Sequence, residues 1–295
     1  MDVAWPRADK STRFTNDREG FVALKRWLGA GLPELVVYEA TGAYHSAFEL
    51  AFSGQLPLHK INPLQARRFA QACGLRAKTD KVDAAMLAAM GATLDMEPDP
   101  VVSKEHYELK ELQIERTALI KDRTRLKNRL KTQILALTRR QTKARLAQIE
   151  RQLKAIDGEI ETRIEQDRPR ALDILKSIPG IGSTTAAAIL IECPEIGSLG
   201  RKQIASLAGL APMTRQSGQW RGTAFIQGGR KFLRDALYMP ALVTSKFNPD
   251  MAAKYKAMRR ERKPEKVALT AIMRKLIELA NTLIKQNRTW TQKPA

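Results

Sequence analysis

The chain has 295 residues, with 51 Lys and Arg against 31 Asp and Glu, which gives a net charge of +20. This excess favours a polyanion such as DNA or RNA, because each phosphate that a cation neutralises releases condensed counterions. The sequence contains no long apolar run, signal peptide or basic amphipathic anchor, so we expect no membrane partner. Its two cysteines, Cys73 and Cys193, are far apart, which fits a reducing cytoplasm, and the three scattered histidines indicate no zinc site.

The positive charge is unevenly distributed along the chain. Residues 1–100 hold 12 basic and 12 acidic side chains, residues 101–168 hold 17 and 11, and residues 169–295 hold 22 and 8. All of the excess therefore follows residue 100. Together with the changes in pattern described below, this predicts an α/β domain over 1–100, a coiled coil over 101–168 and a mainly helical domain over 169–295.

In the first hundred residues, short apolar runs alternate with helical patterns, which is typical of an α/β domain. Caps and turn residues set the expected boundaries. They predict strands over 1–5, 12–15, 35–38 and 56–61, and helices over 17–28, 43–52 and 63–74.

The stretch from Lys78 to Asp83 is the centre of this domain. Thr79 can cap the helix that follows, and Asp80 and Asp83 then fall on one face of its first turn. Two carboxylates there suit Mg²⁺ or Mn²⁺, although acids also favour a helix N-terminus for its dipole alone. Glu39 ends a predicted buried strand, where open α/β sheets bind ligands, and we expect it to join them.

Residues 103–168 show a heptad-like pattern that predicts a coiled coil, formed within the chain or with a second copy. An offset of nine residues between Leu137 and Leu146 predicts a helix reversal or stutter near residues 138–143. From Lys121 to Arg145 there are ten basic residues and one acid. Solvated coiled-coil faces usually mix the two signs, so this imbalance favours contact with a polyanion.

Two segments of the last domain are candidates for binding phosphate. Pro179-Gly180-Ile181-Gly182 predicts a helix–hairpin–helix whose turn exposes backbone N–H groups, with a Ser183/Thr184 cap on the second helix, although a plain αα-hairpin fits as well. A second helix is expected to start after Gly228-Gly229 with three cations near its N-terminus, namely Arg230, Lys231 and Arg234. A final helix over residues 266–285 should complete the core.

Ser217 is a hydroxyl that stands between Arg215 and a glycine turn. A serine needs a base or charge stabilisation to act as a nucleophile, and serine–glycine is also a common turn. The residues alone therefore leave both interpretations open.

Several motifs in this order resemble the IS-one-ten insertion-sequence family of DEDD transposases. The motifs are Val37-Tyr38-Glu39-Ala40-Thr41-Gly42-Ala43-Tyr44, Ile61-Asn62-Pro63, Lys78-Thr79-Asp80-Lys81-Val82-Asp83-Ala84, Pro179-Gly180-Ile181-Gly182, Leu207-Ala208-Gly209-Leu210-Ala211-Pro212 and Ser217-Gly218. The resemblance implies an RuvC-like (RNase H fold) N-terminal domain, a coiled coil and a C-terminal transposase domain, in a bacterial protein associated with the nucleoid.

In that family, four acids bind Mg²⁺, a C-terminal serine is thought to link covalently to DNA, and a structured RNA guides recombination. The resemblance makes Glu39, Asp80 and Asp83 the second to fourth acids and Ser217 the candidate nucleophile. We expect Gly180, Gly182, Arg215, Arg230, Lys231 and Arg234 to contact nucleic acid.

The sequence departs from the family pattern at its start. Met1-Asp2-Val3-Ala4 matches the family's second strand, so the first strand and its aspartate are expected to be missing. A less favoured alternative is that Asp2 is itself the first of the four acids. Three functions stay open. They are a recombinase that uses Ser217, a metal-dependent RuvC-like nuclease or junction resolvase, and an inactive nucleic-acid-binding remnant. Because Ser217 lies far along the chain from the acids, we also expect a homo-oligomer, formed through the coiled coil, with shared sites.

Overall fold

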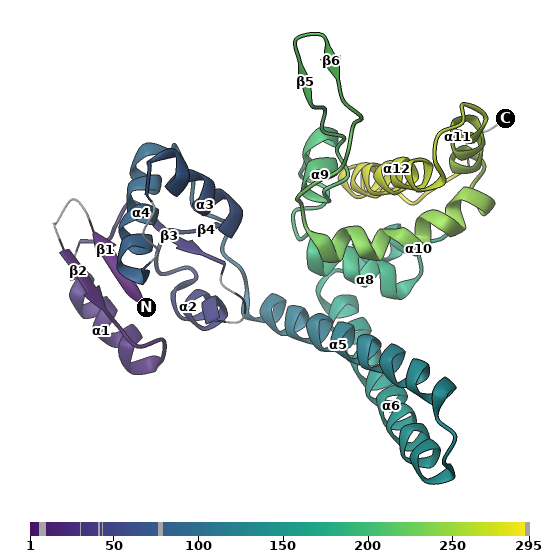
Figure 1. The fold of residues 1–295 in the computed structure, drawn as a ribbon, viewed down its shortest axis with the longest axis horizontal. Coiled ribbons are helices and arrows are strands. Elements are labelled where there is room, and N and C mark those ends of the chain that lie inside the picture. The colour runs from purple at the N-terminus through teal and green to yellow at the C-terminus, as the bar shows by residue number, and fades with distance from the viewer. Residues whose placement is uncertain (6–9, 30, 41, 43, 76–78, 293–295) are drawn as a thin grey trace. The chain divides into compact units, whose positions relative to one another are not determined.

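The computed structural model describes residues 1–5, 10–29, 31–40, 42, 44–75 and 79–292. The chain divides into two compact units, Met1–Tyr107 and Glu108–Ala295, and each is described by itself (Figure 1). Among the described helices, none combines the length and the apolar composition that crossing a membrane requires.

The first unit is a mixed α/β fold built on two short sheets. Strands β1 and β2 pair antiparallel with Asp2 opposite Arg13, and β3 and β4 pair parallel with Glu39 opposite Ile61. Its elements in chain order are β1 (Asp2–Trp5), β2 (Lys10–Arg13), α1 (Arg18–Leu28), β3 (Val36–Glu39), α2 (Tyr44–Phe52), β4 (Leu58–Ile61), α3 (Pro63–Ala72) and α4 (Asp80–Thr93). All the predicted elements form, although β2 begins and ends two residues before the range expected for it.

Side-chain caps set the start of three of these helices, as the sequence predicts. The Asp17 carboxylate accepts a hydrogen bond from the Gly20 N–H at 2.9 Å. The Asn62 amide oxygen accepts one from the Leu64 N–H at 2.8 Å, ahead of Pro63 at the first helical position. The Thr79 hydroxyl accepts one from Val82 at 3.3 Å and so fixes Asp80 as the first residue of α4.

Helix α4 packs against both β1 and β3 and so connects the two sheets. A glycine permits the closest approach, because a Cβ at Gly91 would lie 2.7 Å from Cγ2 of Val37. On another side of the unit, the rings of Phe21, Phe48 and Phe52 form an aromatic cluster with centroids 5.0–6.4 Å apart. The first turn of α4 is therefore held at a fixed place relative to the end of β3.

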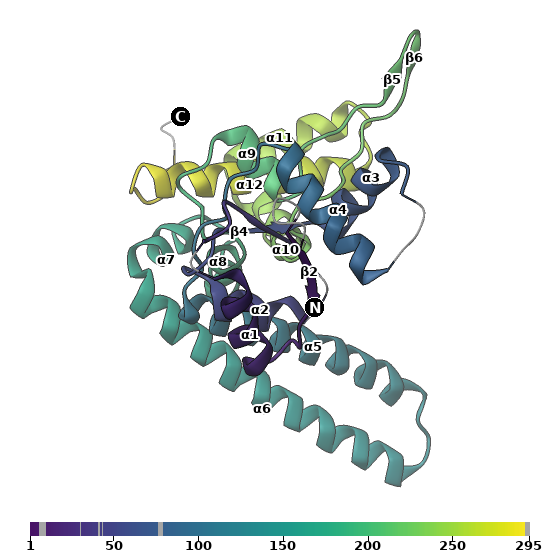
Figure 2. The same cartoon turned by 90° about the vertical axis from the view of Figure 1, so that its left-hand side faces the viewer.

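A long helical hairpin begins the second unit. Helix α5 (Lys104–Thr132), which starts in the first unit, runs antiparallel to α6 (Ala136–Asp167) (Figure 2). Arg116 pairs with Asp157 at 2.5 Å, and their apolar seam is formed by Leu119, Leu126, Ile149 and Leu153. The predicted helix pairing thus occurs within the chain.

The predicted place of the reversal was wrong, because the turn occupies residues 133–135. The heptad-like pattern predicts Leu137 in the seam, but its side chain is 57% exposed, whereas Thr142 is buried. When Thr142 is counted together with the apolar positions, Thr142, Leu146 and Ile149 follow the heptad-like spacing without a break. Arg139 stabilises the turn by donating hydrogen bonds to the carbonyls of Leu130 and Gln133.

The rest of the second unit is mainly helical and contains the largest core. Its elements are α7 (Pro169–Lys176), α8 (Ser183–Glu192), α9 (Arg201–Leu207), β5 (Gln216–Ser217), β6 (Trp220–Arg221), α10 (Lys231–Phe247), α11 (Pro249–Arg260) and α12 (Glu265–Lys285). Helix α12 confirms the predicted last helix and completes the core through buried Ile272, Leu276 and Leu283.

Candidate functional site

The three predicted acids of the first unit face one cavity of about 450 Å³. Glu39 is the last residue of β3 and is half-buried, Asp80 begins α4 and is exposed, and Asp83 follows one turn later. Asp2 of β1 lines the same cavity, which is bounded by β1, β3, α1 and α4. The fold therefore brings carboxylates from β1, β3 and α4 to one cavity, which Glu34 also lines.

Arg13 is a cation that lies beside this set. Its guanidinium lies 3.0 Å from the Asp2 carboxylate and 4.0 Å from that of Asp80, so it stands between two of the acids. The hydrogen bond to Asp2 also raises the pKa of Arg13. Asp2 thus forms an ion pair with Arg13, which lies opposite it in the β1–β2 hairpin.

The donor set fits a hard divalent cation. Carboxylate oxygens around a partly open cavity are the ligands that Mg²⁺ and Mn²⁺ take, together with retained waters. In the described part of the chain, no three Asp, Glu, His or Cys side chains are close enough to hold an ion between them. Glu39, Asp80 and Asp83 face a shared space without forming a closed site.

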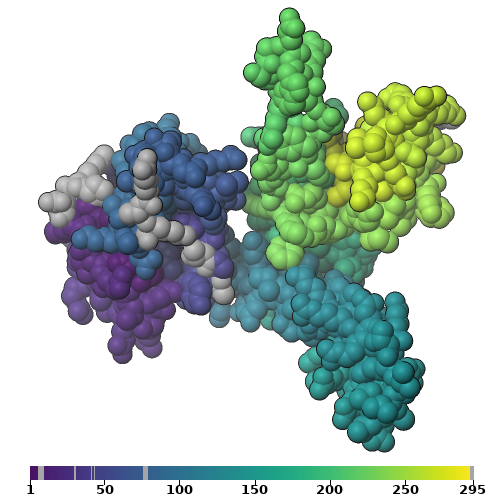
Figure 3. Space-filling model, viewed as in Figure 1, coloured from purple at the N-terminus to yellow at the C-terminus, as the bar shows by residue number. Residues whose placement is uncertain are grey.

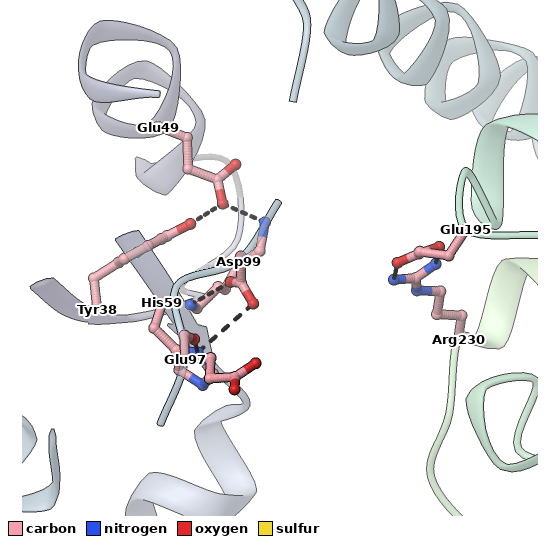
Figure 4. A network of polar contacts seen from close by, with 8 residues as sticks. Tyr38, Glu49, His59, Glu97, Asp99, Glu195 and Arg230 are labelled. Atoms are coloured by element: carbon pink, nitrogen blue, oxygen red, sulfur yellow. Dashed lines mark hydrogen bonds and ion pairs between the residues drawn. The ribbon is translucent and has the colours of Figure 1, made fainter. Parts of the chain in front are cut away.

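Beside the cavity, a buried network fixes the end of β3 (Figure 4). Glu49 of α2 is only 4% exposed and accepts hydrogen bonds from the Tyr38 hydroxyl and the Lys60 ammonium, and from Tyr107 at 3.1 Å. Burial by itself would raise the pKa of Glu49, but the hydrogen bonds from Lys60 and Tyr38 outweigh it and lower that pKa. Burial and the contact with Glu49 raise the pKa of Tyr38. This network joins β3, α2 and β4 directly before Glu39.

In the second unit, Ser217 lies at the tip of an exposed β-hairpin, which we call the arm (residues 210–228). Ser217 in β5 pairs with Trp220 in β6 across a two-residue loop in which Gly218 has φ 57°. Figure 3 shows the arm projecting from its unit. The Arg215 guanidinium lies 4.6 Å from the centroid of the Phe225 ring. Ser217 and Arg215 are therefore both on the surface of one ribbon.

Two glycines close the base of the arm. A Cβ at Gly229 would lie 2.1 Å from the backbone nitrogen of Gly209, and both residues have positive φ, at 68° and 65°. Only glycine allows the two backbones to meet in this way. The Arg230 N–H also donates to the Leu207 carbonyl at 2.7 Å, so the ends of the arm are held together.

The predicted helix–hairpin–helix corresponds to α7, a turn and α8. Gly180 has φ 95° and packs against α10, since a Cβ there would lie 2.6 Å from Cγ2 of Thr244. Gly182 is exposed, with open space where its side chain would be. The predicted Ser183/Thr184 cap was wrong, because Gly182 is itself the cap residue and Ser183 is already helical. Gly182 leaves the start of α8 accessible to solvent, whereas Gly180 allows the turn to pack closely against α10.

The three cations near the start of α10 have partners within the fold. Arg230 makes a double hydrogen bond to Glu195 at 2.6 and 2.7 Å (Figure 4) and donates to the Glu192 carbonyl at 2.7 Å. Lys231 pairs with Asp235, and Arg234 donates to the Gly228 carbonyl at 2.6 Å. Arg230 makes three of these hydrogen bonds, and its ion pair joins the start of α10 to the segment after α8.

Two residues of these sites escaped the sequence argument. Arg13 was not considered as a partner of the acids, because its place opposite Asp2 depends on the register of the hairpin. The sequence pattern does not single out Trp220, yet this side chain is 59% exposed opposite Ser217. The spacing Ser-Gly-Gln-Trp, with glycine at a two-residue hairpin loop, was the available signal.

Two family models and several known proteins match this chain. Residues 6–139 match a DEDD transposase family of the IS110 type, and residues 172–256 match the family described as "Transposase IS116/IS110/IS902 family". The pilin gene-inverting proteins of Moraxella lacunata and Moraxella bovis are each 31% identical over 297 aligned residues, covering 95% of this chain and 90% of theirs. An uncharacterized 43.6 kDa protein of insertion element IS110 from Streptomyces coelicolor is 28% identical over 142 residues, which is 48% of this chain and 35% of that protein.

The DEDD family implies an RNase H-like fold for the N-terminal part, which agrees with the mixed α/β unit, and its members typically use a divalent metal. The second matched region covers α7 to most of α11 and includes the arm. The expected family membership is confirmed, and the chain belongs to the IS110/IS116/IS902 transposases, with a DEDD N-terminal part and the family's C-terminal domain.

Proposed function

We propose that this protein is a DNA recombinase that cuts and rejoins DNA with the cavity carboxylates and Ser217. The observation that carries the proposal is the convergence of Glu39, Asp80 and Asp83 on one cavity. Inversion of a DNA segment, the activity in the printed name of the Moraxella relatives, is one outcome of such a reaction.

Each part of the chain has a separate chemical task in this proposal. A divalent cation held by Glu39, Asp80 and Asp83 would polarise the scissile phosphate and stabilise developing charge. The Ser217 oxygen forms a bond to phosphorus as the bond to one deoxyribose oxygen breaks, and that oxygen leaves with a proton. A hydroxyl from another strand end then attacks the serine phosphodiester and releases Ser217. The number of phosphodiester bonds is conserved, so no external energy source is needed.

Trapping of a covalent adduct tests this reaction. Full-length protein is incubated with DNA carrying the ends of its element, Mg²⁺ is varied, and the mixture is denatured and separated by electrophoresis. The expected product is a protein–DNA adduct that Ser217→Ala abolishes and that Ser206→Ala, a matched change at an exposed serine of α9, retains. Metal-dependent cleavage without an adduct would indicate a nuclease in which Ser217 is only a turn residue. Binding without strand breakage would indicate an inactive remnant.

The nucleic-acid surface is proposed to lie mainly after residue 100. Eight of the ten basic residues from Lys121 to Arg145 are exposed on the α5–α6 hairpin. A fragment of residues 101–295 should therefore retain most of the affinity for DNA, and that affinity should fall steeply with salt. Equal affinity in residues 1–100 alone would contradict this assignment.

A guide RNA and self-association complete the proposal. The same basic hairpin suits a structured RNA, which competition between RNA from the element's flanks and unrelated RNA would test. The tip of the hairpin exposes Ile134 and Leu135, at 91% and 70%, and these side chains favour contact with a second copy. If active sites are shared between copies, Ser217→Ala and Asp80→Asn proteins should restore activity when mixed. Mixed oligomers without activity would exclude shared sites.

A further inference from the structure

We propose that Trp220 is a stacking platform for an unpaired or extruded DNA base, and that this contact places the adjoining phosphate beside Ser217. The inference rests on the proposed recombinase function and specifies how the arm engages its substrate. It follows from the exposure, position and chemical surroundings of the indole.

The arm projects into solvent and has the composition of a surface that contacts an anion. All of residues 212–221 are exposed, because this part of the ribbon stands away from the core, and Trp220 itself is 59% exposed. Residues 212–229 contain Arg215 and Arg221 and no acid. An antiparallel two-stranded ribbon of this kind can enter a DNA groove. Aromatic side chains supply sequence-tolerant stacking once such a ribbon reaches unstacked bases.

The indole is held in position by a neighbouring glycine. A Cβ at Gly222 would lie 2.5 Å from Cη2 and 3.0 Å from Cζ2 of Trp220, so the ring rests directly over the Gly222 backbone. The N–H of Gly222 in turn donates to the Arg215 carbonyl at 3.0 Å, which fixes that backbone in the ribbon. A ring supported on one side and open on the other offers one face to a base and loses little freedom on binding.

The pairing register places Ser217 on the same side of the ribbon as the indole. Ser217 and Trp220 are directly opposite each other, and side chains of such a pair share a face, with Cβ atoms about 4.5–5.5 Å apart. A base stacked on Trp220 therefore brings its own sugar–phosphate within reach of the serine side chain. Trp220 acts as a positioning residue, since it touches the base and orients the phosphate for Ser217.

Fluorescence of 2-aminopurine tests the contact directly. The probe is a DNA duplex with one unpaired 2-aminopurine, whose emission is quenched when the base stacks on an indole. Full-length wild-type protein should bind and quench. Trp220→Ala should bind this probe about 5- to 150-fold more weakly, in line with the loss of one stacked base, and should lose the quenching at saturation. Trp220→Phe should restore part of the affinity.

Gly222→Ala provides a second variant that leaves every contacting group in place but displaces the ring, so it should also reduce the quenching. Gln219→Ala, at the same exposed tip, is the matched control and should behave as wild type. Equal quenching by Trp220→Ala and wild type would overturn the stacking role and leave the recombinase proposal intact. A wild-type protein that fails to bind DNA at all would instead contradict the proposed function itself.

Discussion

Arg230 has two candidate roles, namely binding phosphate and stabilising the fold through its ion pair with Glu195. The two roles predict different effects when Arg230 is replaced. If Arg230 binds phosphate, its replacement should weaken DNA binding and leave stability almost unchanged. In the structure its guanidinium makes a double hydrogen bond to the Glu195 carboxylate and a third bond to the Glu192 carbonyl. Burial by itself would lower the pKa of Arg230, and the hydrogen bonds to Glu195 outweigh it and raise that pKa.

The size of the expected effect follows from the burial of the pair. Removing one partner of a fully buried ion pair costs about 3–5 kcal/mol, because the other charge stays buried without compensation. Here the side chains are 32% and 29% exposed, so water compensates part of the loss and we expect about 2–3 kcal/mol for Arg230→Met. Glu195→Gln combined with Arg230→Met should cost less than the sum of the two single changes, since the uncompensated charge is then absent.

Urea unfolding followed by circular dichroism measures these differences in a double-mutant cycle. A coupling free energy of about 1 kcal/mol or more, with an unchanged salt dependence of DNA binding in Arg230→Met, is the expected result. A coupling below about 0.5 kcal/mol together with a shallower salt slope would refute this reasoning and return Arg230 to the phosphate-binding set.

Three further predictions follow from the two units. Asp80→Asn and Asp83→Asn should each weaken Mn²⁺ binding in a calorimetric titration while the far-ultraviolet spectrum stays unchanged, and unaltered titrations in both would exclude the assigned ligands. Gly91→Ala should destabilise the first unit by about 1–3 kcal/mol in thermal unfolding, since its methyl group would overlap Val37, and an unchanged melting temperature would contradict the close packing of α4 on β3. Burial raises the pKa of Glu192, so the carboxyl holds its proton more tightly in the folded chain and stability should fall as pH rises from its unfolded value of 4.5 through the folded pKa. Glu192→Gln should remove that part of the pH dependence in unfolding measured from pH 4 to pH 7, and a profile identical to that of wild type would contradict the shift.

Local signals in the sequence were sufficient to predict a helix start or a strand end where a single side chain determines that boundary. Thr79 and the Asn62-Pro63 pair set helix starts through contacts only two or three residues away, and the structure has those starts. Glu39 was placed correctly at a strand end. The helix reversal was misplaced because Thr142 is a buried polar residue, and a pattern of apolar residues cannot register it.

Contacts between distant segments were beyond such reasoning. Arg230 looks like a free cation beside a glycine turn, and only the fold brings Glu195 to it, 35 residues away along the chain. The same holds for Arg13, whose approach to Asp80 joins segments that are far apart in sequence. The types of residue at the candidate site could thus be predicted, whereas their pairing depended on tertiary structure.

The glycine contact at the base of the arm has a consequence for how this protein can evolve. Because Gly209 and Gly229 hold the two ends together, the exposed part of the ribbon from residue 212 onward can change in length and composition with little effect on the helical core. Arms could therefore be exchanged between distant relatives as modules, with the two glycines kept as junctions. Chimeric proteins built in this way would change how a substrate is engaged without a new core having to evolve.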